Sequence, residues 1–274
     1  MPVANIIMRR YNIVQGLFLS FGSQSFYRDV ASNWRGAAFG LLLILALLIA
    51  LKMALFINSE LSNFDRFYAP GYISQLPTIT VNNGEATTPQ AIPYMITEPT
   101  SSRPVLMIDT SREQIDTSAN QAIVFLSRTH LAYRKSPDET KLYDLSQLDD
   151  MVVTQESAHH FIDFMANWLG WILAPFIFLG VYVLRLLLAL AYAVIGLVVG
   201  IAMRVSLPFE AMLALAMVTA APVVVTEFIF SLFSSGFNIP WLLSLGINLV
   251  LLAFAIHANK PDDNGQISAS EAGP

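Results

Sequence analysis

The chain has 274 residues, of which 55% are hydrophobic and only 13% are charged, and its formal net charge is −5. Soluble domains carry about a quarter charged residues, so this composition excludes an ordinary soluble domain and indicates a membrane protein. The absence of cysteine excludes disulfides, thiol catalysis and thiolate metal sites, and the negative charge gives no reason to expect a nucleic-acid partner.

Residues 1–33 are predicted to form a cytoplasmic amphipathic segment in the membrane interface. Its apolar residues recur at helical spacing, with arginines opposite, which is typical of a helix lying along a bilayer. The apolar positions are Val14, Leu17, Phe18 and Phe21, followed by Phe26, Val30 and Trp34. We expect four residues of this region to meet lipid headgroups or a protein partner: Tyr27, Arg28, Trp34 and Arg35.

Residues 34–57 are predicted to be the first transmembrane helix. Their apolar run, AAFGLLLILALLIALKMALFI, has about the 20 residues needed to cross a bilayer. It lacks a small-x-small cleavage site, so we expect an uncleaved anchor. The 36 residues before the run carry Arg9, Arg10, Arg28 and Arg35 against Asp29 alone. This excess of positive charge places the N-terminus in the cytoplasm.

Residues 58–157 are predicted to form an extracytoplasmic domain of α+β or mostly β structure. The apolar runs here have strand length and are separated by Pro, Gly and Asn. Examples are LPTITVNNGEA, IPYMITEP, RPVLMIDTS, AIVFLSRTHLAYR and TKLYDLSQL. The NNG sequence at 82–84 predicts a turn, and a short helix is expected near residues 60–68.

The last third is predicted to hold three more spans. Residues 158–204 form a long helix that includes the second span, 208–233 the third and 239–258 the fourth, followed by a disordered cytoplasmic tail at 259–274. The long apolar segment could instead be two spans joined near Arg185, which would make five. The distribution of basic residues favours four spans with both termini in the cytoplasm.

Polar residues inside the spans are the best candidates for a functional site, because intramembrane charge is costly. Counting outward from the turn near Ser206 puts Arg185 level with Glu227 and Arg204 level with Glu210 as a helix-turn ion pair. The next turn puts Glu227 level with Asn248. Arg185, Glu227 and Asn248 are therefore predicted to form an intramembrane polar cluster. It could be a structural ion pair or part of a substrate or proton path, unless Arg185 lies at a cytoplasmic turn.

Two further sequence patterns give weaker evidence for a functional site than the intramembrane polar residues do. Glu156, His159, His160 and Asp163 share one helical face and are candidate metal ligands, although a polar helix face is the better interpretation. IDTS occurs at 108–111 and again at 115–118, but it lacks the glycine of an aspartic-protease loop, so a strand-to-turn role is expected. No catalytic residue and no cofactor is predicted.

The chain resembles bacterial membrane proteins of the domain-of-unknown-function 1189 family. The resemblance lies in SFYRDVASNWRG before the first span, PVLMIDTS, TKLYDLSQL and RVSLPFEAMLALAMVTAAPVV. It covers about residues 15–258 and implies a polytopic inner-membrane protein with an extracytoplasmic insertion after its first span. The span after VSLPFE also looks like Yip-type membrane proteins, which would suggest membrane organisation or partner binding.

These observations predict a non-enzymatic inner-membrane scaffold, regulator or accessory subunit of an envelope complex. Its partners would be the lipid bilayer and another protein or further copies of the chain. The alternative is a transporter component that uses Arg185, Glu227 and Asn248. An enzyme with a metal at Glu156, His159 and His160 is the third possibility.

Overall fold

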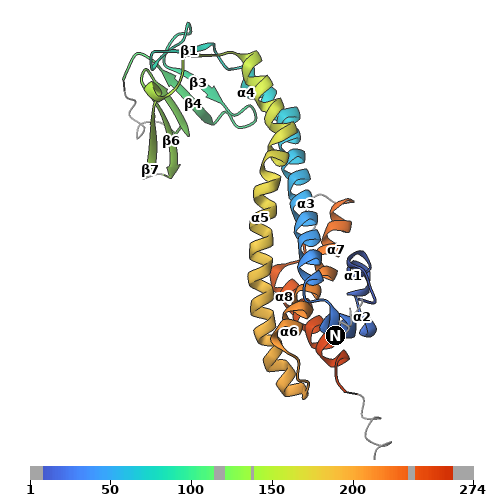
Figure 1. Cartoon of the computed structure of the whole chain (residues 1–274). Helices are drawn as coiled ribbons and strands as arrows, with labels where there is room; N and C mark the ends of the chain where they lie inside the picture. Colours follow the sequence, from blue (N-terminus) through green and yellow to red (C-terminus); the bar gives the residue numbers. More distant parts are fainter. Residues whose placement is uncertain (1–8, 114–120, 137–138, 234–237, 262–274) are drawn as a thin grey trace, which may run out of the picture. The chain divides into compact units, whose positions relative to one another are not determined.

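The computed structural model describes residues 9–113, 121–136, 139–233 and 238–261 (Figure 1). The second IDTS sequence and all but the first residues of the predicted tail lie outside these ranges. The chain divides into two compact units, one made of Met1–Phe56 with Trp171–Pro274 and the other of Ile57–Gly170. Each is described by itself below.

The first unit is helical and contains the apolar runs. Its elements are α1 (Ile13–Leu19), α2 (Gln24–Asn33), most of α3 (Ala37–Phe67) and of α5 (Gln155–Met203), α6 (Phe209–Val218), α7 (Ala221–Ser231) and α8 (Trp241–Ala258). Among the described residues, four helical stretches are long and apolar enough to cross a membrane, with α6 and α7 counted as one. The predicted number of candidate spans is therefore confirmed.

The 49-residue α5 runs without interruption through Arg185. The alternative with a hairpin at that arginine is wrong, because the sequence there offers little turn chemistry and the helix simply continues. The third predicted span differs from expectation, since it is two helices that meet at Thr219 and Ala220. Pro222 has no backbone N–H and interrupts the helical hydrogen bonding at this point. The Thr219 hydroxyl donates to the carbonyl of Ala216 at 3.0 Å and caps the end of α6.

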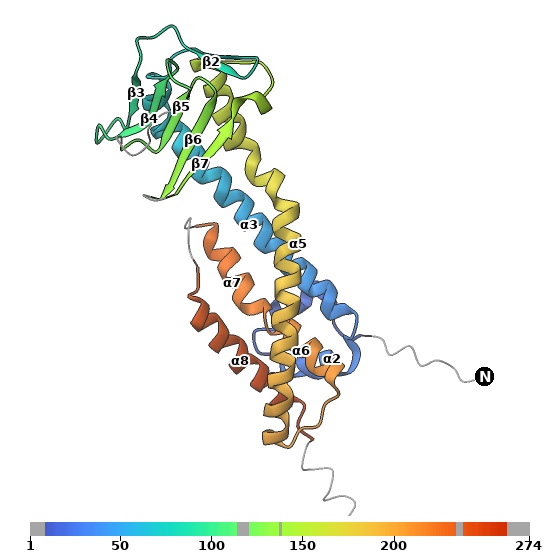
Figure 2. The same ribbon diagram turned by 90° about the vertical axis from the view of Figure 1, so that its left-hand side faces the viewer.

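The core of the helical unit is built around α2, which packs against α6 and α8 (Figure 2). The largest fully buried side chains of α2 and its C-cap are Phe26, Tyr27 and Trp34. They belong to one apolar cluster with residues of α3, α5, α6 and α8. An amphipathic segment predicted to lie along the membrane is thus a central part of the helical core.

The second unit contains two sheets. It begins with the last residues of α3, followed by α4 (Ala69–Ile73), and ends with the first residues of α5. The strands are β1 (Ile79–Asn82), β2 (Glu85–Thr87), β3 (Tyr94–Thr97), β4 (Pro104–Asp109), β5 (Val124–Ser127), β6 (His130–Ser136), β7 (Glu139–Asp144) and β8 (Met151–Val153), with a 3-10 turn η1 (Leu145–Gln147). The three-stranded sheet has the order β2-β1-β8 and the five-stranded sheet the order β3-β4-β5-β6-β7.

The apolar faces of the two sheets share a core. Ile79 and Val81 of β1 pack in one cluster with Ile108 of β4 and Leu126 of β5. The predicted NNG turn is present: Asn83 and Gly84 both have positive φ and connect β1 to β2 in a two-residue hairpin loop. The helix predicted at 60–68 exists, but it is the continuation of α3 rather than a separate element. The predicted sheet-containing domain between helices is confirmed.

Candidate functional site

A small polar cavity lies inside the helical unit. Its volume is about 10 Å³, which is room for about one water molecule. Arg185 and Tyr192 of α5 and Asn248 of α8 line it, together with apolar residues of α3 and α6 and with Ala220 at the helix break. Two of the three residues predicted to form an intramembrane cluster therefore meet at one place.

Two oxygen atoms at this cavity lack a hydrogen-bond partner in the described part of the chain. Asn248 is only 3% exposed, and its Oδ1 accepts no hydrogen bond there. The Tyr192 hydroxyl is buried as well; it faces the Asn248 side chain and interacts electrostatically with Arg185. A buried polar group without a full set of partners costs about 1–3 kcal/mol, so Asn248 and Tyr192 are the costly polar groups of this cavity.

Tyr192 was not identified by the sequence reasoning, which considered only charged and amide residues. The signal was available, because Tyr192 follows Arg185 by seven residues. Residues seven apart lie two turns apart on one helical face. A search for polar residues on the face of α5 that carries Arg185 would have found it.

Glu227 does not complete the predicted cluster. It acts on Arg185 electrostatically, but no ion pair joins the two among the described residues. Its Oε1 accepts a hydrogen bond from the N–H of Ile239 at 3.0 Å, just before α8. The register count assumed one continuous helix from the Ser206 turn, whereas the break at Thr219 and Ala220 changes the position of α7. Glu227 thus holds the start of α8 instead of lining the cavity.

This contact makes a testable prediction for Glu227. Glu227→Gln retains an acceptor for the Ile239 N–H and should keep the thermal stability of the wild type in detergent. Glu227→Ala leaves that N–H unpaired and should cost about 1 kcal/mol. The exchange Arg185→Glu with Glu227→Arg should fail to restore membrane abundance, since arginine has no acceptor for Ile239. Recovery in the exchanged variant would show that an Arg185–Glu227 ion pair is the stabilising element after all.

The second predicted ion pair is also replaced. The Glu210 carboxylate lies 3.0 Å from Nη1 of Arg35, and among the residues described no ion pair connects it to Arg204. Arg204 has a φ of 58° and ends α5 in a left-handed turn, in which the N–H of Val205 donates to the carbonyl of Gly200 at 2.9 Å. The count of residues across the turn did not take account of this backbone conformation. Both partners of the Arg35–Glu210 pair are well exposed, so we expect it to contribute little to stability.

The segment around α2 differs most from its prediction. Tyr27 and Trp34 are 0% exposed and therefore cannot meet lipid headgroups. The Tyr27 hydroxyl donates to the carbonyl of Ser20, and burial raises the pKa of Tyr27, so the phenol remains a donor. Arg28 Nε donates to the carbonyl of Ala258 at the end of α8, at 2.6 Å. Most of the residues predicted for a surface instead connect helices within the unit.

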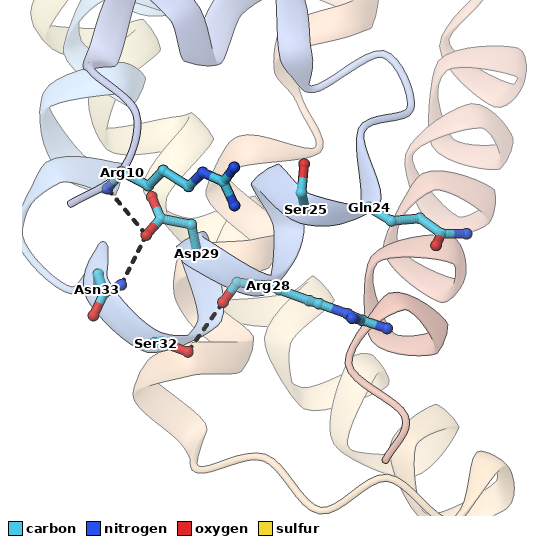
Figure 3. Close-up of a pocket in the computed structure, with 7 residues that line it drawn as sticks. All are labelled: Arg10, Gln24, Ser25, Arg28, Asp29, Ser32 and Asn33. Atoms are coloured by element: carbon cyan, nitrogen blue, oxygen red, sulfur yellow. Dashed lines mark hydrogen bonds between the residues drawn. The ribbon is translucent and has the colours of Figure 1, made fainter. Parts of the chain in front are cut away.

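Asp29 organises this segment. Its carboxylate accepts hydrogen bonds from Asn33 Nδ2 at 2.7 Å and from the backbone N–H of Arg10 at 3.3 Å (Figure 3). It also accepts one from Trp34 Nε1 at 2.8 Å. Burial raises the pKa of the Asp29 carboxyl. The hydrogen bonds from Asn33, Trp34 and the backbone of Arg10 and Tyr11 lower it by more, so the pKa lies below its ordinary value. The aspartate treated in the sequence as a minor negative charge is the central acceptor.

The remaining candidates form no site. Glu156, His159, His160 and Asp163 are all exposed at the start of α5, where His160 Nε2 lies 3.9 Å from Glu156 Oε1. In the described ranges, no group of three or more potential ligands could hold a metal ion. Asp109 ends β4 and accepts hydrogen bonds from the N–H and hydroxyl of Ser111, which is the expected strand-to-turn geometry.

The α2 contacts explain the most recognisable part of the sequence, FYRDV-x-x-x-WRG, as a set of side chains that join helix ends. The family model described as Protein of unknown function (DUF1189) matches residues 14–256. The chain belongs to this family. No curated protein and no solved structure matches it, and the resemblance to Yip-type proteins finds no support in these comparisons. The DUF1189 match extends from the second residue of α1 through almost all of α8, with the β-sheet unit included.

Proposed function

We propose that this protein is a non-enzymatic accessory or scaffold protein of the bacterial inner membrane that offers its β-sheet unit to a protein partner. In this proposal α3, α5, α6–α7 and α8 cross the membrane, the N-terminus is cytoplasmic and residues 58–157 are extracytoplasmic. The positive residues before α3 support this orientation. The ends of three candidate spans also support it. Arg28 of α2 contacts Ala258 at the end of α8, and Arg35, between α2 and the start of α3, contacts Glu210 at the start of α6.

The observation that carries the partner proposal is the open edge of the five-stranded sheet. β7 is the last strand of that sheet and, in the part of the chain described, pairs only with β6. Five of its six residues are exposed, including Leu142 at 60% and Tyr143 at 53%. An exposed edge strand has unpaired N–H and C=O groups that can pair with an extended segment of another chain.

The opposite edge of the same sheet is closed by a side chain. Gln75 donates from Nε2 to the carbonyl of Thr97 on β3 at 2.9 Å, and its Oε1 accepts from the Thr97 N–H at 2.9 Å. The Tyr94 hydroxyl also donates to the carbonyl of Gln75 at 2.8 Å. β3 is thus protected at its end, whereas β7 is not, which singles out β7 as the edge for an added strand.

The apolar pattern of the sheet continues to the β7 edge. One row of paired residues crosses all five strands: Met95, Met107, Phe125, Ala132 and Leu142. The three inner members are buried, whereas Leu142 at the edge is exposed. A strand added beside β7 would extend this row and cover Leu142. We propose that the partner supplies such a strand with an apolar residue at that position.

Site-specific photocrosslinking in native membranes tests the proposal. A photoreactive residue at Leu142 should give one discrete crosslinked protein, and the same residue at Leu148, which is 49% exposed but off the sheet edge, should not. A photoreactive residue placed at Tyr143 should also give a crosslink. Adding Thr140→Pro, which prevents regular pairing along β7, should abolish this crosslink while membrane abundance stays unchanged. Equal crosslinking from Leu148 would contradict a strand-donating partner, and capture of a second copy of this chain would show that the β7 edge pairs with itself and not with a different protein.

The transporter component remains the alternative proposal, and the polar cavity beside the break between α6 and α7 supports it. Interrupted helices line the binding sites of many transporters. A cavity of about 10 Å³ suits water or a proton better than a larger solute. Proteoliposomes that contain the protein but show no proton flux above empty vesicles would exclude this alternative.

A further inference from the structure

A second polar pocket lies on the surface of the helical unit beside α2. Its volume is about 680 Å³, and the residues that line it include Arg10, Ser25, Arg28, Asp29 and Ser32 (Figure 3). No step of the proposed partner binding uses it. Its two arginines carry donors suited to phosphate oxygens, whereas the Ser32 hydroxyl already donates to the carbonyl of Arg28.

The charge balance of this pocket favours an anion. The Asp29 carboxylate is only 7% exposed and its oxygens are already occupied by Trp34, Asn33 and the backbone of Arg10. Arg10 forms no ion pair with the other described residues, and its guanidinium lies 5.5 Å from the centre of the Tyr11 ring. Figure 3 shows the Arg28 side chain extended away from Asp29. The exposed charge that Arg10 brings to the pocket is therefore positive.

The pocket lies where candidate spans begin and end. Arg28 lines the pocket and also contacts the carbonyl of Ala258, the last residue of α8. Arg35, shortly after α2, pairs with Glu210 in the first turn of α6. In a membrane-embedded protein, helix ends of this kind lie at the level of the lipid headgroups. The anion found at that level is the phosphate of a phospholipid.

An apolar surface accompanies the pocket. α1 and the turn after it leave Val14, Phe18 and Phe21 at least half exposed, at 60%, 65% and 50%. These positions follow the i, i+4, i+7 spacing of one helical face. The opposite side of α1 is packed, since Gly16 is buried against Trp34 and Phe26. Phe21 comes three residues before Gln24, which lines the pocket, so apolar surface and pocket are adjacent in the chain.

From these observations we infer that the protein binds an anionic phospholipid between α1 and α2. The phosphate lies in the pocket with Arg10, Arg28 and Ser25, and the acyl chains lie along Val14, Phe18 and Phe21. This inference goes beyond the proposed partner binding, because it concerns the helical unit and not the β-sheet unit, and it uses none of the residues of β7. It requires only that the helical unit is embedded in a bilayer.

Native mass spectrometry and thermal unfolding test this inference on the intact protein. The protein is reconstituted in nanodiscs of phosphatidylcholine with or without phosphatidylglycerol, and the retained lipids and the unfolding temperature are measured. We expect phosphatidylglycerol to be retained preferentially and to raise the unfolding temperature. Arg10→Gln should weaken retention about fivefold, the effect of one basic residue near an anionic surface.

Arg9→Gln is the matched control, because Arg9 is the neighbouring arginine but does not line the pocket. It should retain the lipid as the wild type does. A second variant, Phe18→Ser, should reduce lipid retention without lowering the response to inorganic phosphate. Equal losses in Arg9→Gln and Arg10→Gln, no preference for phosphatidylglycerol, or the same stabilisation by millimolar inorganic phosphate alone would each overturn the lipid site.

Discussion

Trp34→Ala is expected to reduce the free energy of unfolding by about 3–5 kcal/mol, as deletion of a buried large aromatic side chain typically does. The Trp34 side chain is 0% exposed, and its ring meets the ring of Phe26 edge-to-face at 5.1 Å between centroids. A Cβ placed at Gly16 would lie 2.9 Å from the indole, which shows how closely α1 packs on it. The loss should appear as a large drop in membrane abundance and in the unfolding temperature in detergent.

Two further variants separate packing from hydrogen bonding. Trp34→Phe retains most of the ring but leaves the Asp29 carboxylate without its indole donor, so we expect a loss of about 1–3 kcal/mol. Trp241→Ala is the control, since Trp241 is 70% exposed in the same unit and its loss should change stability little. Similar losses for the two alanine variants would show that burial at Trp34 is not what stabilises the protein.

The Asp29 hydrogen bonds also predict a pH dependence. Because the folded-state pKa of Asp29 lies below its unfolded value of about 3.9, its contribution is complete above that value and is lost as the pH falls through the folded pKa. The unfolding temperature of the wild type should thus fall as the pH drops below about 4, and Asp29→Asn should show a smaller fall. Parallel pH profiles for both proteins would contradict this role.

Gly200→Leu is expected to destabilise the helical unit by about 3 kcal/mol, at the upper end of the usual range for overpacking. A Cβ at Gly200 would lie 2.9 Å from the carbonyl oxygen of Val205. That oxygen belongs to the backbone of the turn after α5, so it cannot move aside as a flexible side chain could. The expected result is low membrane abundance and a clearly lower unfolding temperature.

Gly180→Leu is the matched control on the same helix. A Cβ at Gly180 would meet nothing within 4 Å, so this variant adds the same side chain without a clash. It should behave as the wild type or slightly better, because leucine favours helix more than glycine does. A destabilisation at Gly180 as large as that at Gly200 would mean that added volume on α5, rather than the contact with Val205, is responsible.

Several features were predictable because they depend on local patterns. The apolar runs of the four candidate spans are long enough to be recognised by composition alone, and the NNG turn follows from the residues that tolerate positive φ. Strand-length apolar runs between Pro, Gly and Asn likewise predicted the sheet-containing unit. Each of these predictions needs only residues that are neighbours in the chain.

The polar sites were predicted less well, for an identifiable reason. The pairings of Arg185 with Glu227 and of Arg204 with Glu210 assumed straight helices joined by a short turn. The break before Pro222 and the left-handed backbone conformation of Arg204 changed those registers. A contact between two side chains is sensitive to such a change, whereas the presence of a span is not.

The sequence by itself determined that the chain has four candidate spans, a β-rich unit after the first of them and a recognisable signature before it. Only the tertiary structure decided what the signature does. SFYRDVASNWRG has the apolar spacing of a helix that could lie on a membrane or pack in a core, and the two are indistinguishable from periodicity alone. The contacts of Asp29 with Trp34, of Arg28 with Ala258 and of Arg35 with Glu210 decide for the core. The last two contacts join residues far apart in the chain, and long-range contacts of this kind exist only once the helices have packed.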